Sequence, residues 1–339
     1  MLRLDHYWYH CNTLATLLRP LSWCFRGLIS LRKLLYRSGV LKSIRLPVPV
    51  IVVGNISVGG TGKTPLVIAL IALLKKHGYT PGIITRGYGG NVDKEPLMVT
   101  ANSDPFKLSD EAVLLAQRTQ CLVVACPDRI ASSQLLIEQG CNIIVSDDGL
   151  QYYRLERDIE IAVIDASRGL GNGYCLPAGP LREPEQRLKT VDFVVINGLG
   201  TYNKGSNNSD HYNMTMHSHA PRCLINNEEK PIGHFTGTSI HAIAAIGNPQ
   251  RFYNYLRSLG LTVIEHHFSD HYRYQTEDIV FDDEYPVLMT EKDAVKCREI
   301  IKDEKYYYIA IDAILDGRLE PSLMSLLKTV TAQDTASNR

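Results

Sequence analysis

The chain has 339 residues, 45% of them hydrophobic, which is enough to bury a substantial core in about two domains. Lysine plus arginine and aspartate plus glutamate both total 36, which excludes a strongly basic nucleic-acid binder and a charge-driven disordered chain. The 8 cysteines include no C-x-x-C pair, and in a chain of this length they favour a reducing compartment over a disulfide framework.

Residues 1–46 are expected to form a basic amphipathic helix. Arg19, Arg26 and Lys33 fall on the face opposite an apolar stripe, and Pro20 suits a first helical turn, so the helix is expected to restart there. No uncharged apolar run approaches the roughly 20 residues that cross a bilayer. Two readings remain equally open, contact with an anionic membrane surface or packing on the chain's own domain. The stripe consists of Leu14, Leu17, Leu21, Cys24, Leu28, Leu31 and Leu35.

A glycine-rich run follows the apolar stretch 49–53 and precedes the helical stretch 66–74. Backbone N–H groups and a helix N-terminus can surround phosphate there, while Lys63 reaches the β- and γ-phosphates and the Thr64 hydroxyl ligates Mg²⁺. Ser57 stands where the usual pattern has glycine, and the glycines after it can supply the missing backbone freedom. The run predicts a nucleoside triphosphate site in preference to a plain strand-to-helix turn. Its residues are Ser57, Val58, Gly59, Gly60, Thr61, Gly62, Lys63 and Thr64.

Residues 47–199 alternate β-branched runs with helical stretches, as a mostly parallel α/β sheet requires. Residues 200–213 are polar and rich in glycine, asparagine and serine, so we expect a linker there. Residues 214–339 then repeat the α/β pattern and predict a smaller C-terminal domain. Expected strands are 50–53, 82–85, 122–125, 143–146, 159–164, 193–196, 241–246, 261–265, 287–289 and 307–311, and expected helices are 65–77, 110–117, 129–139, 249–259 and 321–330.

Two sets of carboxylates are candidates for chemistry. Asp147 and Asp148 leave the apolar strand 143–146, where hard oxygen ligands can hold Mg²⁺ directly or through water; the alternative is a turn cap. Asp110 precedes a helix without a buried strand before it. It can orient an acceptor hydroxyl, or it can serve with Ser109 merely as a helix cap, and the two readings have even odds.

The loop 171–184 is long and dense in glycine and proline, and loops of this kind are often functional. Arg182 can neutralise phosphate charge and Glu183 can enter a metal shell, although a solvated ion pair between them is equally consistent with the composition.

The late histidines His266, His267 and His271 lack a fourth ligand at zinc spacing, so the default for most of them is a surface or interface role. One of them can tune a catalytic carboxylate through a hydrogen bond or through its charge.

Taken together, these segments resemble the lipid A 4′-kinase family, the tetraacyldisaccharide 4′-kinases, from the N-terminal helix to about residue 300. The resemblance implies a P-loop core, a smaller C-terminal α/β domain and phosphorylation of the 4′-hydroxyl of a tetraacylated glucosamine disaccharide by ATP with Mg²⁺. It also implies a peripheral or monotopic location on the cytoplasmic face of the bacterial inner membrane, against its anionic surface, with no nucleic acid and no protein partner. The segments that carry it are 54–65, 85–90, 109–111, 147–151, 176–184, 247–249, 270–271 and 291–293.

The resemblance also implies roles for single residues. Asp110 matches the catalytic carboxylate, and His271 matches the histidine that pairs with it. One departure is Tyr152, where the family usually has histidine, because tyrosine cannot carry a positive charge. The remaining implied positions are Lys63 and Arg182 at the phosphates, Thr64, Asp147, Asp148 and Glu183 at the metal, and Tyr88 and Gln151 at the acceptor substrate.

A second hypothesis from another class is a nucleotide-dependent switch or partitioning ATPase. A switch would hydrolyse ATP slowly without an acceptor and respond to a partner or to dimerisation, whereas a kinase requires its acceptor lipid.

Overall fold

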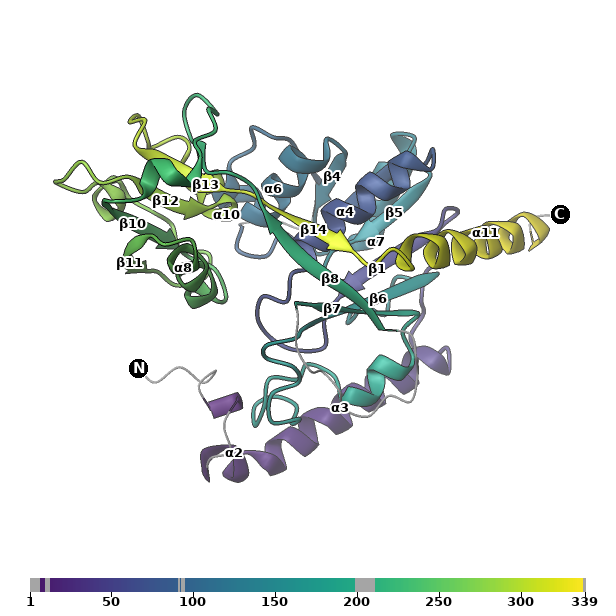
Figure 1. The fold of residues 1–339 in the computed structure, drawn as a ribbon. Helices are drawn as coiled ribbons and strands as arrows, with labels where there is room; N and C mark the ends of the chain where they lie inside the picture. Colours follow the sequence, from purple (N-terminus) through teal and green to yellow (C-terminus); the bar gives the residue numbers. More distant parts are fainter. Residues whose placement is uncertain (1–6, 10–12, 91, 93–94, 199–210, 338–339) are drawn as a thin grey trace.

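A computed structural model describes residues 7–9, 13–90, 92, 95–198 and 211–337 (Figure 1). Within these ranges the larger sheet has 9 strands in the order β14-β8-β7-β6-β1-β5-β2-β4-β3. Only β3 on β4 and β14 on β8 pair antiparallel, so the expected mostly parallel α/β fold is confirmed. The strands are β1 (Val50–Gly54), β2 (Pro81–Thr85), β3 (Leu97–Val99), β4 (Leu122–Ala125), β5 (Ile143–Ser146), β6 (Ile159–Asp165), β7 (Phe193–Asn197), β8 (His211–Ser218) and β14 (Ile311–Leu315).

Helices cover both faces of this sheet, and β1 shows how the core is divided between them. Ile51 and Val53 point into the cluster formed with α4, α6 and α11, whereas Val50 and Val52 point into the cluster on the opposite face. Every β1 residue is buried, as expected for a central parallel strand. The helices of this part are α4 (Lys63–Lys76), α5 (Pro105–Leu108), α6 (Asp110–Thr119), α7 (Arg129–Glu138), η1 (Glu185–Lys189) and α11 (Leu319–Ser337).

A second sheet, with 5 described strands in the order β11-β10-β12-β13-β9, forms the smaller part of the molecule. Three of its four pairings are parallel and build the α/β pattern expected late in the chain. Its elements are β9 (Arg222–Cys223), η2 (Ile232–Phe235), β10 (Ser239–Ala244), α8 (Pro249–Ser258), β11 (Thr262–His267), α9 (Thr276–Ile279), β12 (Val287–Thr290), α10 (Glu291–Cys297) and β13 (Tyr306–Ile309).

The strand pairing does not follow the expected division at residue 214. β8 pairs with β7 in the larger sheet and β14 pairs with β8 (Figure 1). The side chains of Leu319, Leu323 and Leu327 pack into the larger core. The linker expected at 200–213 lies outside the described residues except for its last three, which begin β8. β8 looks polar in sequence because it lies next to the edge strand and alternates partly exposed residues with buried Met214.

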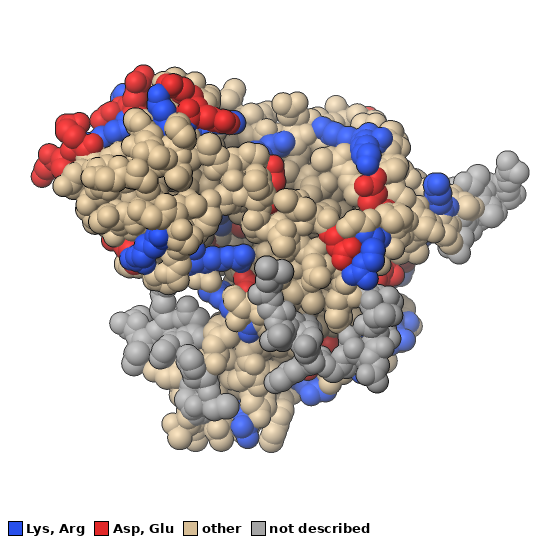
Figure 2. All heavy atoms as spheres, in the orientation of Figure 1, with Lys and Arg blue, Asp and Glu red and all other residues tan. Residues whose placement is uncertain are grey.

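The N-terminal segment forms two helices along one side of the larger part, α2 (Thr13–Leu17) and α3 (Arg19–Arg37), with Pro20 in the first turn of α3. Ser22 donates to the carbonyl oxygen of Cys175 at 2.7 Å, and Phe25 packs on the core. The surface of this helix is mostly uncharged in Figure 2, with isolated Lys and Arg side chains. Within the described ranges no helix is long and apolar enough to cross a membrane. The expected domain begins earlier, in residues 1–6, which lie outside those ranges.

Candidate active site

The glycine-rich loop lies at the carboxyl end of β1 and leads into α4. Gly62 caps α4 in a left-handed conformation with φ 94°, and no side chain caps the helix, so its first-turn N–H groups can bind an anion. Asn197 Nδ2 donates to the Thr61 carbonyl oxygen at 3.0 Å and fixes the turn. Ser57 forms a β-bridge with Leu181 in extended backbone, which explains why this position does not need glycine.

The acidic pair follows β5, next to this loop. Asp148 Oδ2 lies 2.9 Å from Arg182 Nη1, and its Oδ1 lies 3.7 Å from Lys63 Nζ. Asp147 is buried, its Oδ1 has no hydrogen-bond partner among the described residues, and burial together with the charge of Glu111 raises its pKa to about 7. A buried carboxylate oxygen without a partner, beside a second carboxylate, fits a divalent cation such as Mg²⁺.

Glu183 and Gln151 brace the loops around the phosphate site. The Glu183 carboxylate accepts from Gln151 Nε2 at 2.8 Å and from the Tyr153 hydroxyl at 2.5 Å, and it lies 3.3 Å from Arg187 Nε. Gln151 Nε2 also donates to the Asn55 carbonyl oxygen at 3.1 Å. The solvated pair of Glu183 with Arg182 is not formed, because Glu183 is buried and Arg182 turns to Asp148.

Asp110 and His271 meet across the boundary between the two parts of the molecule. Asp110 is the first residue of α6 and 4% exposed, and its Oδ1 lies 3.0 Å from His271 Nδ1. Burial would raise the pKa of Asp110, but the hydrogen bond from His271 and the charge of Lys292 outweigh it and lower that pKa. Ser109 occupies the N-cap position of α6 without a side-chain cap hydrogen bond.

Residues 87–90 support His271 from the other side. Gly89 has φ +85°, and a Cβ built on it would lie 2.8 Å from His271 Nδ1, so only glycine fits there without displacing the ring. The Tyr88 ring meets His271 edge-on at 5.3 Å between ring centres while 67% of Tyr88 remains exposed. Tyr88 therefore offers an open aromatic surface directly beside the Asp110–His271 pair.

The other late histidines lie in the smaller sheet and do not converge on one point. His266 Nε2 lies 2.8 Å from His241 Nδ1, and His267 pairs with Glu265. Among the described residues no group of three or more His, Cys, Asp or Glu side chains is placed so that it could hold a metal ion.

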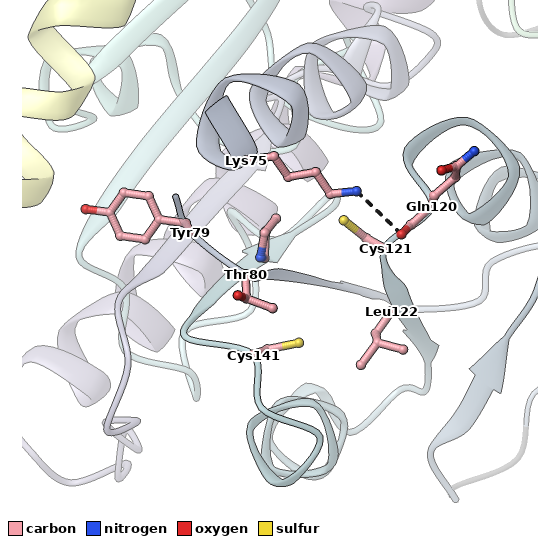
Figure 3. Close-up of a pocket in the computed structure, with 8 residues that line it drawn as sticks. Lys75, Tyr79, Thr80, Gln120, Cys121, Leu122 and Cys141 are labelled. Carbon is pink, nitrogen blue, oxygen red and sulfur yellow. Dashed lines mark hydrogen bonds between the residues drawn. The ribbon is translucent and has the colours of Figure 1, made fainter. Parts of the chain in front are cut away.

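Two cavities can be compared with this site. One of about 290 Å³ lies at the opposite, amino-terminal edge of β2 and β4, where Lys75 Nζ binds the carbonyl oxygens that end α6 (Figure 3). The other, of about 410 Å³, lies at the carboxyl ends of β6 and β7 and includes Asp165, Asn197 and Arg251 among its lining residues. Only the second adjoins the phosphate loop, because Asn197 binds Thr61.

Sequence reasoning assigned no role to three polar residues at the site, of which Arg129 and Asn197 are buried and Lys292 is partly buried. Lys292 lies 3.8 Å from Asp110 Oδ2, Arg129 Nη2 donates to the Asp148 carbonyl oxygen at 2.8 Å, and Asn197 shapes the loop. Asn197 could have been found from its position, because it is a polar residue at the carboxyl end of an otherwise apolar strand, and ligands of parallel α/β sheets bind at the carboxyl ends of the strands. No comparable signal indicated a role for Arg129, and Lys292 stood out only within the segment 291–293 that carries the resemblance, because the neighbours of both residues lie far along the chain.

A parallel sheet with an uncapped glycine loop at its central strand, an acidic pair on the adjacent strand and a buried Asp–His pair nearby defines a P-loop phosphotransferase. The profile of the family described as LpxK, tetraacyldisaccharide-1-P 4′-kinase, matches residues 14–330. The chain belongs to this family.

Named relatives agree with this assignment. The chain is 47% identical over 323 residues to a tetraacyldisaccharide 4′-kinase of Nitrosococcus oceani, covering 95% of this chain and 93% of that one. It is 41% identical over 338 residues to the enzyme of that name from Coxiella burnetii, covering 99% and 98%. A crystal structure of LpxK from Aquifex aeolicus in complex with ATP matches with a TM-score of 0.78 at 29% identity, covering 93% of this chain and all of that one.

Proposed function

We propose that Asp110, oriented by His271, receives the acceptor hydroxyl while Lys63, Arg182 and a Mg²⁺ ion bind the phosphates of ATP. The chain is an ATP-dependent kinase that phosphorylates the 4′-hydroxyl of the tetraacyldisaccharide lipid A precursor. The observation that carries the residue roles is the Asp110–His271 contact at 3.0 Å, because it joins a carboxylate of the nucleotide-binding part to a histidine of the smaller part. The same family membership argues against a switch ATPase.

The phosphate end of ATP is assigned to the loop and the acidic pair. Lys63 and Arg182 both pair with Asp148, so two cations converge where phosphate charge would lie. Thr64, Asp147 and Asp148 are the residues that would hold Mg²⁺, which would neutralise charge on the transferring phosphate. Glu183 contributes by bracing Gln151 and Tyr153, since its oxygens are engaged with them.

The nucleoside is assigned to the cavity of about 410 Å³ beside Asn197. It lies at the carboxyl ends of the strands, where ligands of parallel α/β sheets bind, and its volume is within the range of small-molecule sites. The buried Asn197 Oδ1 has no hydrogen-bond partner within the described residues, which leaves an acceptor for the bound nucleotide. Arg251 from α8 reaches the same cavity and pairs with Asp165 at 3.3 Å, so both parts of the molecule would contact ATP.

The acceptor hydroxyl is assigned to the space in front of Asp110 and Tyr88. Asp110 is held by His271 Nδ1 and by the backbone N–H of Glu111 at 2.8 Å, so its position is fixed before the substrate arrives. An ionised carboxylate in this setting can accept the hydroxyl proton as the phosphoryl group is transferred. The exposed Tyr88 ring offers a face for the sugar.

The acyl chains are assigned to the membrane beside the N-terminal helices. Leu17, Leu28 and Trp23 expose 75%, 66% and 64% of their surface, and contact of such large apolar side chains with water is unfavourable in free energy. Exposed Arg26 and Arg32 lie on the same helix, so the surface suits an anionic membrane. We therefore place the chain at the membrane surface where its lipid substrate resides, which for this family is the cytoplasmic face of the inner membrane.

The residue roles are tested with labelled ATP and the disaccharide lipid acceptor in detergent micelles. Asp110→Asn should lower transfer of label to lipid at least a hundredfold, the usual range for losing a general base, while the Kd for ATP stays within twofold. Asp278→Asn, which removes a capping carboxylate from α9, serves as the matched control. Full activity in Asp110→Asn would remove Asp110 from the mechanism.

The membrane assignment is tested by sedimentation with vesicles that contain anionic lipid. The double variant Leu21→Glu/Leu28→Glu should remain in the supernatant, because two charges would enter the apolar face. Val280→Glu introduces one charge at a position 55% exposed in the smaller part and should sediment like the parent. Equal sedimentation of all three proteins would contradict the assignment.

A further inference from the structure

Lys292 lies in the first turn of α10, partly buried between carboxylates from both parts of the molecule. Its Nζ is 3.1 Å from Glu111 Oε1, 3.5 Å from Asp270 Oδ1 and 3.8 Å from Asp110 Oδ2. Glu111 and Asp110 begin α6 in the larger part, whereas Asp270 follows β11 in the smaller part. A single ammonium group therefore bridges the boundary at the position of the proposed catalytic carboxylate.

The backbone that carries Lys292 is fixed by the residue that follows it. Asp293 is fully buried and accepts hydrogen bonds from the Ala245 N–H, the Tyr274 hydroxyl and the Thr290 hydroxyl. Lys296 lies 2.8 Å from the same carboxylate. Since Asp293 is locked into the smaller core, Lys292 is directed out of that core and toward α6.

The residue before Lys292 ties α10 to the other end of α6. Arg118 Nη1 lies 2.5 Å from Glu291 Oε2 and also pairs with Asp312 in β14. The first two residues of α10 thus contact both ends of α6, Glu291 through Arg118 and Lys292 through Glu111. The ammonium group has little freedom to leave the three carboxylates.

The charges around the Asp110–His271 pair define what Lys292 does. Burial opposes its charge, but the carboxylates of Glu111, Asp110 and Asp270 outweigh burial and raise the pKa of Lys292, so it stays protonated. The hydrogen bond to Asp110 raises the pKa of His271, while burial and the like charge of Lys292 oppose that rise. The charged groups that act on the pair are Asp270 after β11 and Lys292 and Lys296 from α10. Glu111 from α6 pairs with Lys292, and the Tyr88 ring lies against His271.

We propose that Lys292 is a positioning residue of the kinase, which holds the Asp110 carboxylate ionised and in contact with His271 across the domain boundary. This inference rests on the proposed role of Asp110. Without the ammonium group, three carboxylates within 4.0 Å of its position would repel one another, and the nearest way to relieve that repulsion is uptake of a proton or separation of α10 from α6. Either change would remove the base from its place.

The test compares Lys292→Met, which keeps the stem without the charge, with Lys292→Arg, which keeps the charge. Lys305→Met, at a lysine of the smaller part that binds the Asp283 carbonyl oxygen, is the matched control. We expect Lys292→Met to lower kcat between tenfold and a hundredfold with little change in the Kd for ATP. Removing a cation lets His271 and Asp110 keep protons to higher pH, so the acidic limb of kcat/KM should move upward by about one unit. Lys292→Arg should leave the limb in place.

An unmoved limb in Lys292→Met, or a limb shifted equally by Lys292→Arg, would overturn the inference. If Lys292→Met does not fold, the acidic limb of the kcat/KM profile measured for Lys292→Arg decides, because a shift of that limb would overturn the inference.

The double variant Asp110→Asn/Lys292→Met separates this inference from the proposed function. Because Lys292 acts through Asp110, its loss should cost less than twofold in the Asp110→Asn background. A full additional loss there would refute the role of Lys292 and leave that of Asp110 standing. An Asp110→Asn variant as active as the parent would refute the proposed function itself.

Discussion

Replacing Gly89 with alanine tests whether the position of the His271 ring controls turnover independently of the stability of the fold. The added Cβ would lie 2.8 Å from His271 Nδ1, the atom that faces Asp110 Oδ1 at 3.0 Å. Carbon and nitrogen cannot approach so closely, so the ring must move by several tenths of an ångström. Gly78 has nearly the same backbone, φ +81° against +85°, but a Cβ built on it meets nothing within 4 Å. Gly78→Ala is therefore the matched control.

Both substitutions lower the free energy of unfolding through backbone strain, but only one of them also disturbs a contact at the site. Alanine in a left-handed conformation costs about 1–2 kcal/mol at either position. Only Gly89→Ala also weakens a hydrogen bond to a charged group, worth about 1.5–3 kcal/mol. If that bond orients Asp110 in the transition state, kcat should fall about tenfold to a hundredfold in Gly89→Ala and stay near the parent value in Gly78→Ala.

The assay is the initial rate of phosphate transfer to lipid at saturating ATP, read together with the melting temperature of each variant. Both variants should lose thermal stability, with the larger loss in Gly89→Ala because of the weakened hydrogen bond, and only Gly89→Ala should lose turnover. Equal turnover of the two variants would refute the reasoning, because His271 would then be displaced without consequence or not displaced at all.

Three further outcomes are expected. Asp293→Ala should destabilise the fold by about 3–5 kcal/mol, since it leaves the buried Lys296 ammonium uncompensated, and chemical denaturation measures the loss. The pKa of His271 is raised in the folded chain, so protonated His271 stabilises the fold fully below the ordinary histidine pKa of 6.5, and this stabilisation is lost as the pH rises through the pKa of the folded state. The difference in melting temperature between the parent and His271→Gln should therefore narrow above pH 6.5. A difference that stays constant with pH would contradict the pairing. Mg²⁺ with ATP should stabilise the parent by about 2.7 kcal/mol at a hundredfold excess over Kd, and Asp147→Ala should lose the magnesium-dependent part in differential scanning fluorimetry.

The central strands could be predicted because they are buried on both faces. Residues 50–53 and 143–146 form continuous apolar runs, and the structure places strands β1 and β5 there. β8 was not predicted, because a strand near the edge of a sheet keeps polar residues at its partly exposed positions. β14 returns to the larger sheet after β13 without any break in composition, so only the pairing of Ala313 with Met216 reveals where it belongs.

The phosphate site could be predicted because its parts are close in sequence. Gly62, Lys63 and Thr64 are consecutive, and the spacing of the glycines indicates a loop whose backbone N–H groups can surround an anion. The Asp110–His271 pair is separated by 161 residues, so only the resemblance joined them. The sequence assigned no role to Lys292 for the same reason, because the carboxylates that surround this lysine are brought to it only by the fold.

Three residues of the site have backbone conformations that their surroundings must stabilise. Ser109, Asp148 and His271 have positive φ angles of 81°, 48° and 58°, and each such residue costs on the order of 1–3 kcal/mol unless its surroundings hold it. Asp148 is held by its ion pairs with Lys63 and Arg182, the cations assigned to phosphate. The groups proposed to bind ATP therefore also restrain the backbone, so a substitution at either cation changes folding as well as affinity. Its effect on turnover can be interpreted only when the melting temperature and the Kd for ATP are measured on the same variant.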